Sequence, residues 1–228
     1  VLGSLLQRGY FFQFWFFGAL ILIYLCLPIL KKFLKSKKRY LLVLSVLVII
    51  GLVVELTNIL LQMPVQVYVI QTFRLWTWFF YYILGGFLAQ FSLDTLKKCF
   101  RSWMKEITVV LLFASPLILF MLAKYIHHNL FAEYFYDSIF VKVVSLGTFL
   151  TVLTFDLNTD KNRWIIYLSN QTMGVFVIHT YVMKVWEESV GFSFAGAHLF
   201  FLIFTLSVSF IVVGILMKIP YFNRIVKL

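Results

Sequence analysis

Four polar side chains stand inside or beside long apolar segments of this sequence: Gln13, Glu55, Arg74 and His179. A carboxylate or an imidazole can accept a proton, and a guanidinium can bind an anion or polarise a carbonyl group. Such groups are costly at membrane depth, so they are expected where they serve a function. Asn58 follows Glu55 at helical spacing and shares its face. We therefore take these residues as candidates for one polar pocket.

Each candidate also has a structural explanation. Glu55 could be a protonated or paired carboxyl that only stabilises the fold. Arg74 could extend toward lipid headgroups. His179 could be a hydrogen-bonded histidine of the core. The residues alone leave these alternatives open.

The elements that position these side chains follow from composition. The chain has 228 residues, of which 62% are hydrophobic and 13% charged. A soluble domain of this size cannot hide so much apolar surface, so lipid must cover it. The net charge of +11 comes from short basic clusters between apolar runs, which sets orientation in a membrane and does not indicate nucleic acid. The predicted fold class is all-α, a polytopic transmembrane helical bundle.

Seven segments are apolar enough to span a bilayer, which takes about 20 residues. The sixth is the weakest, because the polar run Ser169–Thr172 interrupts it. The predicted spans are Phe11–Leu30, Leu41–Leu61, Leu75–Phe91, Ile107–Ala123, Ser138–Phe155, Ile165–Met183 and Leu199–Met217. We find no internal repeat and no composition shift, so residues 1–228 are predicted to form a single domain.

Charge sets the orientation of these spans. Most basic residues fall in alternate connections, and they are Lys31, Lys32, Lys35, Lys37, Lys38, Arg39, Lys97, Lys98, Arg101, Lys105, Lys161, Arg163, Lys218, Arg224 and Lys227. The opposite side keeps Arg8, Arg74, Lys124, Lys142 and Lys184. This bias predicts an inner, cytoplasmic membrane protein whose first residue lies outside and whose last lies in the cytoplasm.

The same geometry places the polar candidates at similar depth. Glu55 lies roughly 22 Å from the inner boundary of a core about 30 Å thick, and His179 roughly 24 Å. Gln13 and Arg74 stand at the outer ends of their spans. A shared pocket open to the outside is the expected arrangement.

Other chemistry finds little support. His127 and His128 are expected in a solvated outer loop with Asp137, so no metal site is predicted. Cys26 and Cys99 give no disulfide or metal spacing. Soluble-enzyme signatures such as a nucleophile elbow or a phosphate-binding loop are absent from the sequence. No bound cofactor is expected.

Three motifs, in order, resemble a known family. Gln13-Phe14-Trp15-Phe16-Phe17, followed by Leu22–Pro28, resembles the "HLWFF…YLxxP" segment of membrane-bound acyltransferase family 3. Thr72–Trp78 with Tyr82 and Leu84-Gly85-Gly86 resembles its "fR…YfxlGg" helix. Leu168–His179 resembles its late "lSxxSxgIYxxH" helix. The likeness covers essentially the whole chain.

The resemblance implies a function. Members move an acyl group, usually acetyl, from cytoplasmic acyl-CoA to a sugar hydroxyl of a surface or envelope polysaccharide. They have about ten spans with a cytoplasmic amino end, so this chain looks like the carboxyl-terminal seven. The family's leading catalytic residues, an early histidine and arginine, would lie upstream of Val1, so the catalytic residues are unknown and this portion alone is expected to be inactive.

The resemblance also assigns binding roles within this chain. The predicted substrate-binding residues are His179, Arg74, Glu55, Gln13, Trp15 and Ser169. Gln13 replaces the family's histidine and cannot act as a base near neutral pH. Expected partners are membrane lipid, acyl-CoA and a saccharide acceptor. An exporter of polysaccharide or lipid-linked sugar, or a purely structural membrane subunit, remains the alternative.

Overall fold

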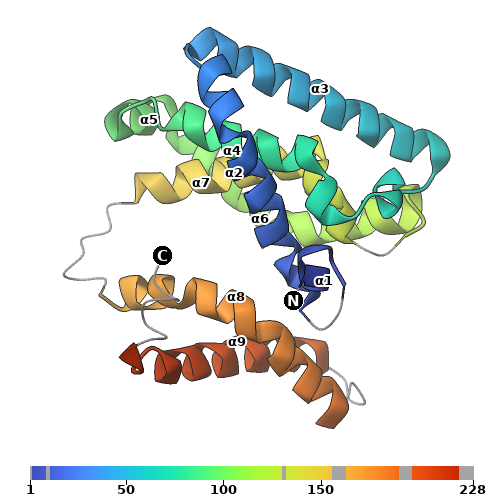
Figure 1. Cartoon of the computed structure of the whole chain (residues 1–228), viewed down its shortest axis with the longest axis vertical. Coiled ribbons are helices and arrows are strands. Elements are labelled where there is room, and N and C mark those ends of the chain that lie inside the picture. The colour runs from blue at the N-terminus through green and yellow to red at the C-terminus, as the bar shows by residue number, and fades with distance from the viewer. Residues whose placement is uncertain (1, 9–10, 130–131, 156–162, 190–196, 221–228) are drawn as a thin grey trace. The chain divides into compact units, whose positions relative to one another are not determined.

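The computed structural model describes residues 2–8, 11–129, 132–155, 163–189 and 197–220. Every regular element in these ranges is a helix (Figure 1). The predicted all-α fold is confirmed. The chain divides into two compact units, residues 1–156 and 157–228. The single domain predicted over residues 1–228 stays a prediction.

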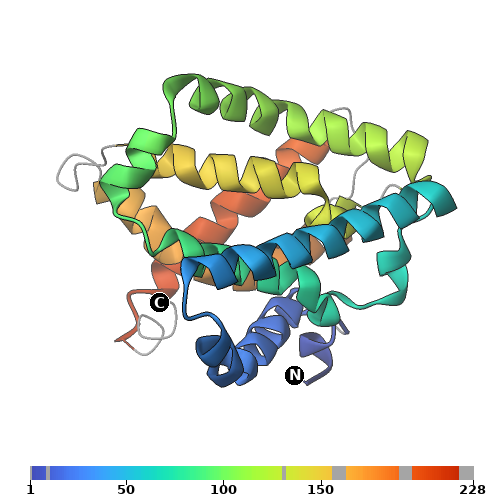
Figure 2. The same ribbon diagram turned by 90° about the horizontal axis from the view of Figure 1, so that it is seen from above.

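The first half of unit 1 is built around α4. Its elements in chain order are α1 (Leu2–Leu5), the 3-10 turn η1 (Phe12–Phe14), α2 (Trp15–Phe33), α3 (Lys37–Leu61), the 3-10 turns η2 (Val65–Tyr68) and η3 (Gln71–Phe73), and α4 (Leu75–Leu88). Both α2 and α3 pack against α4 (Figure 2). Leu44, Phe80 and Ile83 are buried where α3 meets α4.

The second half of unit 1 is a helix pair with irregular connections. It contains α5 (Leu93–Cys99), α6 (Ser102–Met121), the π-helical turn η4 (Leu122–Ile126), the 3-10 turn η5 (Ala132–Asp137) and α7 (Ile139–Thr154). Helices α6 and α7 lie side by side (Figure 2). They touch closely at Gly147, where a Cβ atom would come within 2.6 Å of the Thr108 hydroxyl.

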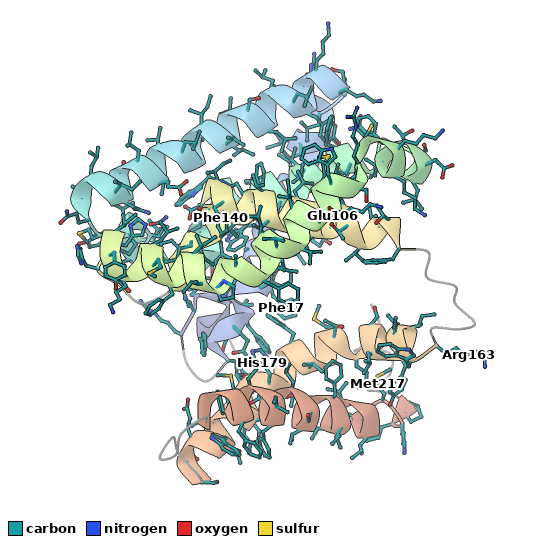
Figure 3. The ribbon with its side chains drawn as sticks, turned by 180° about the vertical axis from the view of Figure 1, so that it is seen from behind. Phe17, Glu106, Phe140, Arg163, His179 and Met217 are labelled. Carbon is teal, nitrogen blue, oxygen red and sulfur yellow. The ribbon has the colours of Figure 1, made fainter. Side chains whose placement is uncertain are left out.

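Unit 2 consists of α8 (Arg163–Ser189) and α9 (Ala197–Leu216), which pack along each other. The Trp186 ring near the end of α8 lies 4.8 Å from that of Phe204 in the first half of α9. The Tyr167 hydroxyl near the start of α8 faces Gly214 near the end of α9. The two helices therefore run antiparallel. Figure 3 shows Arg163 and His179 well separated along α8.

Each of the seven predicted spans overlaps one of these helices, and the number and orientation of the spans stay predictions. Three helical segments are long and apolar enough to cross a bilayer: Phe12–Phe33, Lys37–Leu61 and Ser102–Ile126. Shorter apolar helices are Leu75–Leu88, Ile139–Thr154 and Phe200–Leu216. The 14 residues of α4 extend about 21 Å, less than a hydrocarbon core of about 30 Å. Apolar side chains cover much of their exposed surface, as expected for a helical membrane bundle.

Serine side chains set the start of three helices. Ser36 accepts a hydrogen bond from the main-chain N–H of Arg39, and Ser92 from that of Thr95. Ser138 accepts from the N–H of Phe140. Each side chain occupies the N-cap position, where it satisfies an amide that the helix itself cannot. The short helix α5, absent from the predicted spans, owes its first turn to Ser92.

Candidate functional site

Glu55 binds the first turn of α7 from its place on α3. Its carboxylate accepts hydrogen bonds from the Ser138 hydroxyl at 2.9 Å and from the main-chain N–H of Ile139 at 3.2 Å. The first amides of a helix have no partner within it, and the helix dipole favours an anion there. Glu55 therefore holds α7 against α3.

Arg74 is 4% exposed and binds the connection between α3 and α4. Its Nε donates to the carbonyl oxygen of Val69 at 2.9 Å, and a terminal nitrogen donates to that of Gln66 at 3.0 Å. A side chain this buried does not extend toward lipid headgroups. Arg74 instead shapes the two 3-10 turns that precede α4.

Asp137 joins that connection to the start of α7. Its carboxylate accepts from the Gln66 amide and from the Trp76 indole, both at 3.0 Å. Asp137 and His127 are each 4% exposed, so the solvated loop predicted for them is wrong. The reason is that partners for these residues come from α3, α4 and their connection, far away in the sequence.

Lys142, on α7, contacts this group of residues through the main chain of Asp137. Its ammonium donates to the carbonyl oxygen of Asp137 at 2.7 Å and stands 5.0 Å from the centre of the Phe80 ring. It also rests directly against Gly51, where any Cβ atom would clash with it. A buried cation is tolerated here because a carbonyl oxygen and an aromatic face both stabilise it.

Gln13 and Trp15 occupy the start of α2. Gln13 is buried. The Trp15 ring stacks on that of Trp78, with 4.8 Å between centroids, and the Tyr136 ring lies within 6.3 Å of the Trp15 ring and 5.8 Å of the Trp78 ring. These three rings form an aromatic group beside the network of Asp137.

His179 and Ser169 belong to unit 2. His179 Nδ1 lies 3.1 Å from the carbonyl oxygen of Val175, one helical turn earlier. Because a carbonyl can only accept, this contact places a hydrogen on Nδ1. Ser169 is exposed on α8.

Of the predicted residues of unit 1, Arg74 and Glu55 thus come together in one hydrogen-bonded network. Gln13 and Trp15 lie at the start of α2, where Trp15 belongs to the aromatic group. Arg74 and Glu55 connect through Gln66, Asp137 and Ser138. This network ties α3, α4 and α7 to one another.

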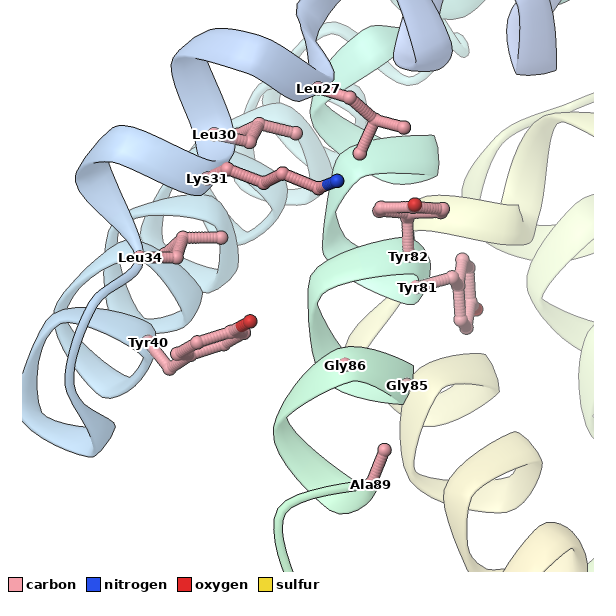
Figure 4. Close-up of a pocket in the computed structure, with 10 residues that line it drawn as sticks. All are labelled: Leu27, Leu30, Lys31, Leu34, Tyr40, Tyr81, Tyr82, Gly85, Gly86 and Ala89. Atoms are coloured by element: carbon pink, nitrogen blue, oxygen red, sulfur yellow. The ribbon is translucent and has the colours of Figure 1, made fainter.

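A cavity of about 640 Å³ lies between α2, the start of α3, and α4 (Figure 4). Its lining combines leucines, tyrosines, small residues and one cation: Leu27, Leu30, Lys31, Leu34, Tyr40, Tyr81, Tyr82, Gly85, Gly86 and Ala89. In Figure 4 the Lys31 and Tyr40 side chains reach from α2 and α3 toward α4. We call this space the main cavity.

Two adjacent glycines open the main cavity along α4. A Cβ atom on Gly85 would meet no other atom within 4 Å, and one on Gly86 would lie 3.5 Å from the Tyr40 ring. Glycine destabilises a helix interior by about 0.5–1 kcal/mol relative to alanine. In α4 the two glycines leave open a space that larger side chains would fill. This glycine pair was the one sequence signal that could have located the cavity.

Comparison with known proteins bears on this arrangement. A family model described as an acyltransferase domain matches residues 1–217. The chain belongs to acyltransferase family 3. No curated protein and no solved structure matches the chain significantly.

In this acyltransferase the first two family-like segments meet at the main cavity. Leu27 belongs to the first motif, while Tyr82, Gly85 and Gly86 belong to the second. The Tyr24 and Tyr82 rings, one from each motif, pack edge to face with 6.4 Å between centroids. The described residues contain no cluster of three or more potential metal ligands. The main cavity offers an amine, phenol hydroxyls and an apolar wall.

Proposed function

We propose that this acyltransferase moves an acyl group from cytoplasmic acyl-CoA to a sugar hydroxyl of an envelope or surface polysaccharide. Acetyl is the group that the family resemblance suggests. The protein would act in the cytoplasmic membrane, taking its donor from one side and delivering to the other.

The main cavity supports this proposal. Acyl-CoA combines phosphate groups with a flexible, less polar arm that ends in a thioester. Lys31 and the Tyr40 hydroxyl can bind phosphate oxygens, and Leu27, Leu30 and Leu34 can bury the arm. Lys31 stands at the end of α2 that charge assigns to the cytoplasm, which is the side where the donor would arrive.

His179 is the residue of this chain best suited to meet the acceptor. With Nδ1 bound to Val175, its Nε2 can accept the hydrogen of a sugar hydroxyl and orient the oxygen. The exposed Ser169 hydroxyl on the same helix could add a hydrogen bond. Within unit 1, the half-buried Trp15 ring could separately bind a sugar face. Arg74 and Glu55 would hold α4 and α7 in place within that unit.

The proposal is tested in membrane vesicles containing the protein expressed from its complete gene. Isotope-labelled acetyl-CoA is supplied, and label on isolated polysaccharide is measured. The Lys31→Ala variant should raise KM for acyl-CoA about tenfold, since a charge-assisted hydrogen bond contributes about 1.5 kcal/mol or more. Lys32→Ala is the matched control, because Lys32 is exposed and does not line the cavity.

Two results would contradict the proposal. Label that never reaches polysaccharide in the wild-type vesicles would remove the enzymatic role. Polysaccharide that is equally acylated with and without the gene, but less exported without it, would favour the exporter.

A further inference from the structure

A second cavity, of about 240 Å³, lies on the other side of α4. Leu84 and Leu88 line it from α4, and Ser145, Leu146 and Phe149 line it from α7. Its wall is almost wholly apolar. We call this space the side slot.

The side slot adjoins the main cavity along one stripe of α4. Tyr81 and Gly85, which are one helical turn apart, line both spaces. At Gly85 a Cβ atom would meet nothing within 4 Å, so there is open space where the two adjoin. The Tyr81 hydroxyl donates to the carbonyl oxygen of Tyr136 at 3.0 Å, which turns this ring toward α7 (Figure 4).

We propose that the side slot receives the acyl chain of the donor, and that the enzyme therefore uses acyl groups longer than acetyl. This inference rests on the proposed function, because it takes acyl-CoA to be bound in the main cavity. With the thioester of the donor near Gly85, the polar arm of CoA would extend toward Lys31. The hydrocarbon chain of the acyl group would extend between Leu84 and Phe149. A mostly apolar slot matches a hydrocarbon chain better than it matches a phosphate or a sugar.

The dimensions agree with a chain of moderate length. The slot has room for on the order of eight methylene-sized groups, if each takes about 30 Å³ as a water molecule does. Each methylene buried there would strengthen binding roughly fourfold. In the transfer itself the carbon–sulfur bond breaks, a carbon–oxygen ester bond forms, and the acceptor's hydroxyl proton ends on the sulfur of free CoA.

The test is a chain-length series in the same vesicles. Acetyl-, butyryl-, hexanoyl- and octanoyl-CoA are compared by the kcat/KM of transfer. We expect hexanoyl-CoA to exceed acetyl-CoA at least tenfold. Values that are equal for all chains, or highest for acetyl and falling with length, would overturn the side slot as the acyl site while leaving the proposed function intact. Transfer from none of the four donors would overturn the proposed function itself.

Two variants with opposite effects sharpen the result. Ser145→Phe should fill the slot and lower kcat/KM for hexanoyl-CoA at least tenfold, with acetyl-CoA changed less than twofold. Val143→Phe is its control, since Val143 is also exposed on α7 but lines another cavity, against α6. Phe149→Ala should widen the slot and move the optimum toward octanoyl-CoA, and the exposed Phe155→Ala is its control. An unchanged length profile in both slot variants would overturn the inference.

Discussion

The side-chain amide of Gln66 donates to both carboxylate oxygens of Asp137, at 3.0 and 3.1 Å, across 71 residues of sequence. Asn58 donates in turn to the amide oxygen of Gln66 at 2.9 Å. All three residues are buried. This chain of hydrogen bonds connects α3, the segment before α4 and the start of α7.

Replacing Asp137 should therefore weaken the fold. Asp137→Ala leaves the buried Gln66 amide and the half-buried Trp76 indole without their acceptor, and a buried unpaired donor costs about 1–3 kcal/mol. Thermal unfolding of the detergent-solubilised protein measures the loss. Asp94→Ala, in the exposed first turn of α5, should change the free energy of unfolding by no more than about 1 kcal/mol. Equal melting temperatures for the two variants would contradict the role of Asp137.

Gly51 should tolerate no side chain. In Gly51→Ala the new methyl group meets the Lys142 ammonium, which cannot move without leaving the Asp137 carbonyl. A cost of about 1–3 kcal/mol is expected from the forced displacement. Gly85→Ala provides the contrast, because its methyl group meets nothing within 4 Å and alanine favours a helix. Melting temperatures equal to that of the wild type in both variants would contradict the close contact between Gly51 and Lys142.

His127 should make stability depend on pH. Burial lowers the pKa of His127 below its ordinary value of 6.5, and the nearby Glu55 carboxylate opposes this shift. Below pH 6.5 the unfolded chain binds a proton more readily than the folded one, so stability falls as pH drops from 6.5 through the folded-state pKa. Melting temperatures between pH 7.5 and 5 should decline less in His127→Gln than in the wild type. His128→Gln, at an exposed neighbour, should retain the full decline.

His179 should be needed for acylation without being needed for folding. His179→Ala removes the Nε2 acceptor proposed to orient the sugar hydroxyl, and a loss of about 10²–10⁴-fold in kcat is expected if that group assists proton transfer. Membrane abundance and melting temperature should stay close to wild type, because the ring is only half-buried. Tyr181→Ala, at an exposed position on the same helix, serves as control. Wild-type transfer by His179→Ala would refute the role.

The helices of this protein were predictable because each apolar run is long. Leu41–Leu61 and Ile107–Ala123 lie within α3 and the segment formed by α6 and its π-helical turn. Ser169–Thr172 did not break α8, since these residues still form main-chain hydrogen bonds within the helix. The short helix α5 was missed because seven residues carry too little periodicity.

The polar network was only partly predictable. Glu55 and Arg74 stood out because charged groups are rare in apolar segments. Their partners did not, because Gln66 and Asp137 lie in connections, where polar residues are ordinary. The main cavity depends on how α2 and α4 face each other, which no local pattern reports. Gly85 and Gly86 were its only local sign.

Arg74 has a consequence for how this protein can change over evolution. The two bonds described for it end on main-chain oxygens, those of Val69 and Gln66, and a main-chain oxygen is present whatever residue bears it. The exposed Val67 and Tyr68 between them can therefore be exchanged without releasing the arginine. The turns before α4 therefore form a platform whose exposed residues can change while its main-chain geometry is kept.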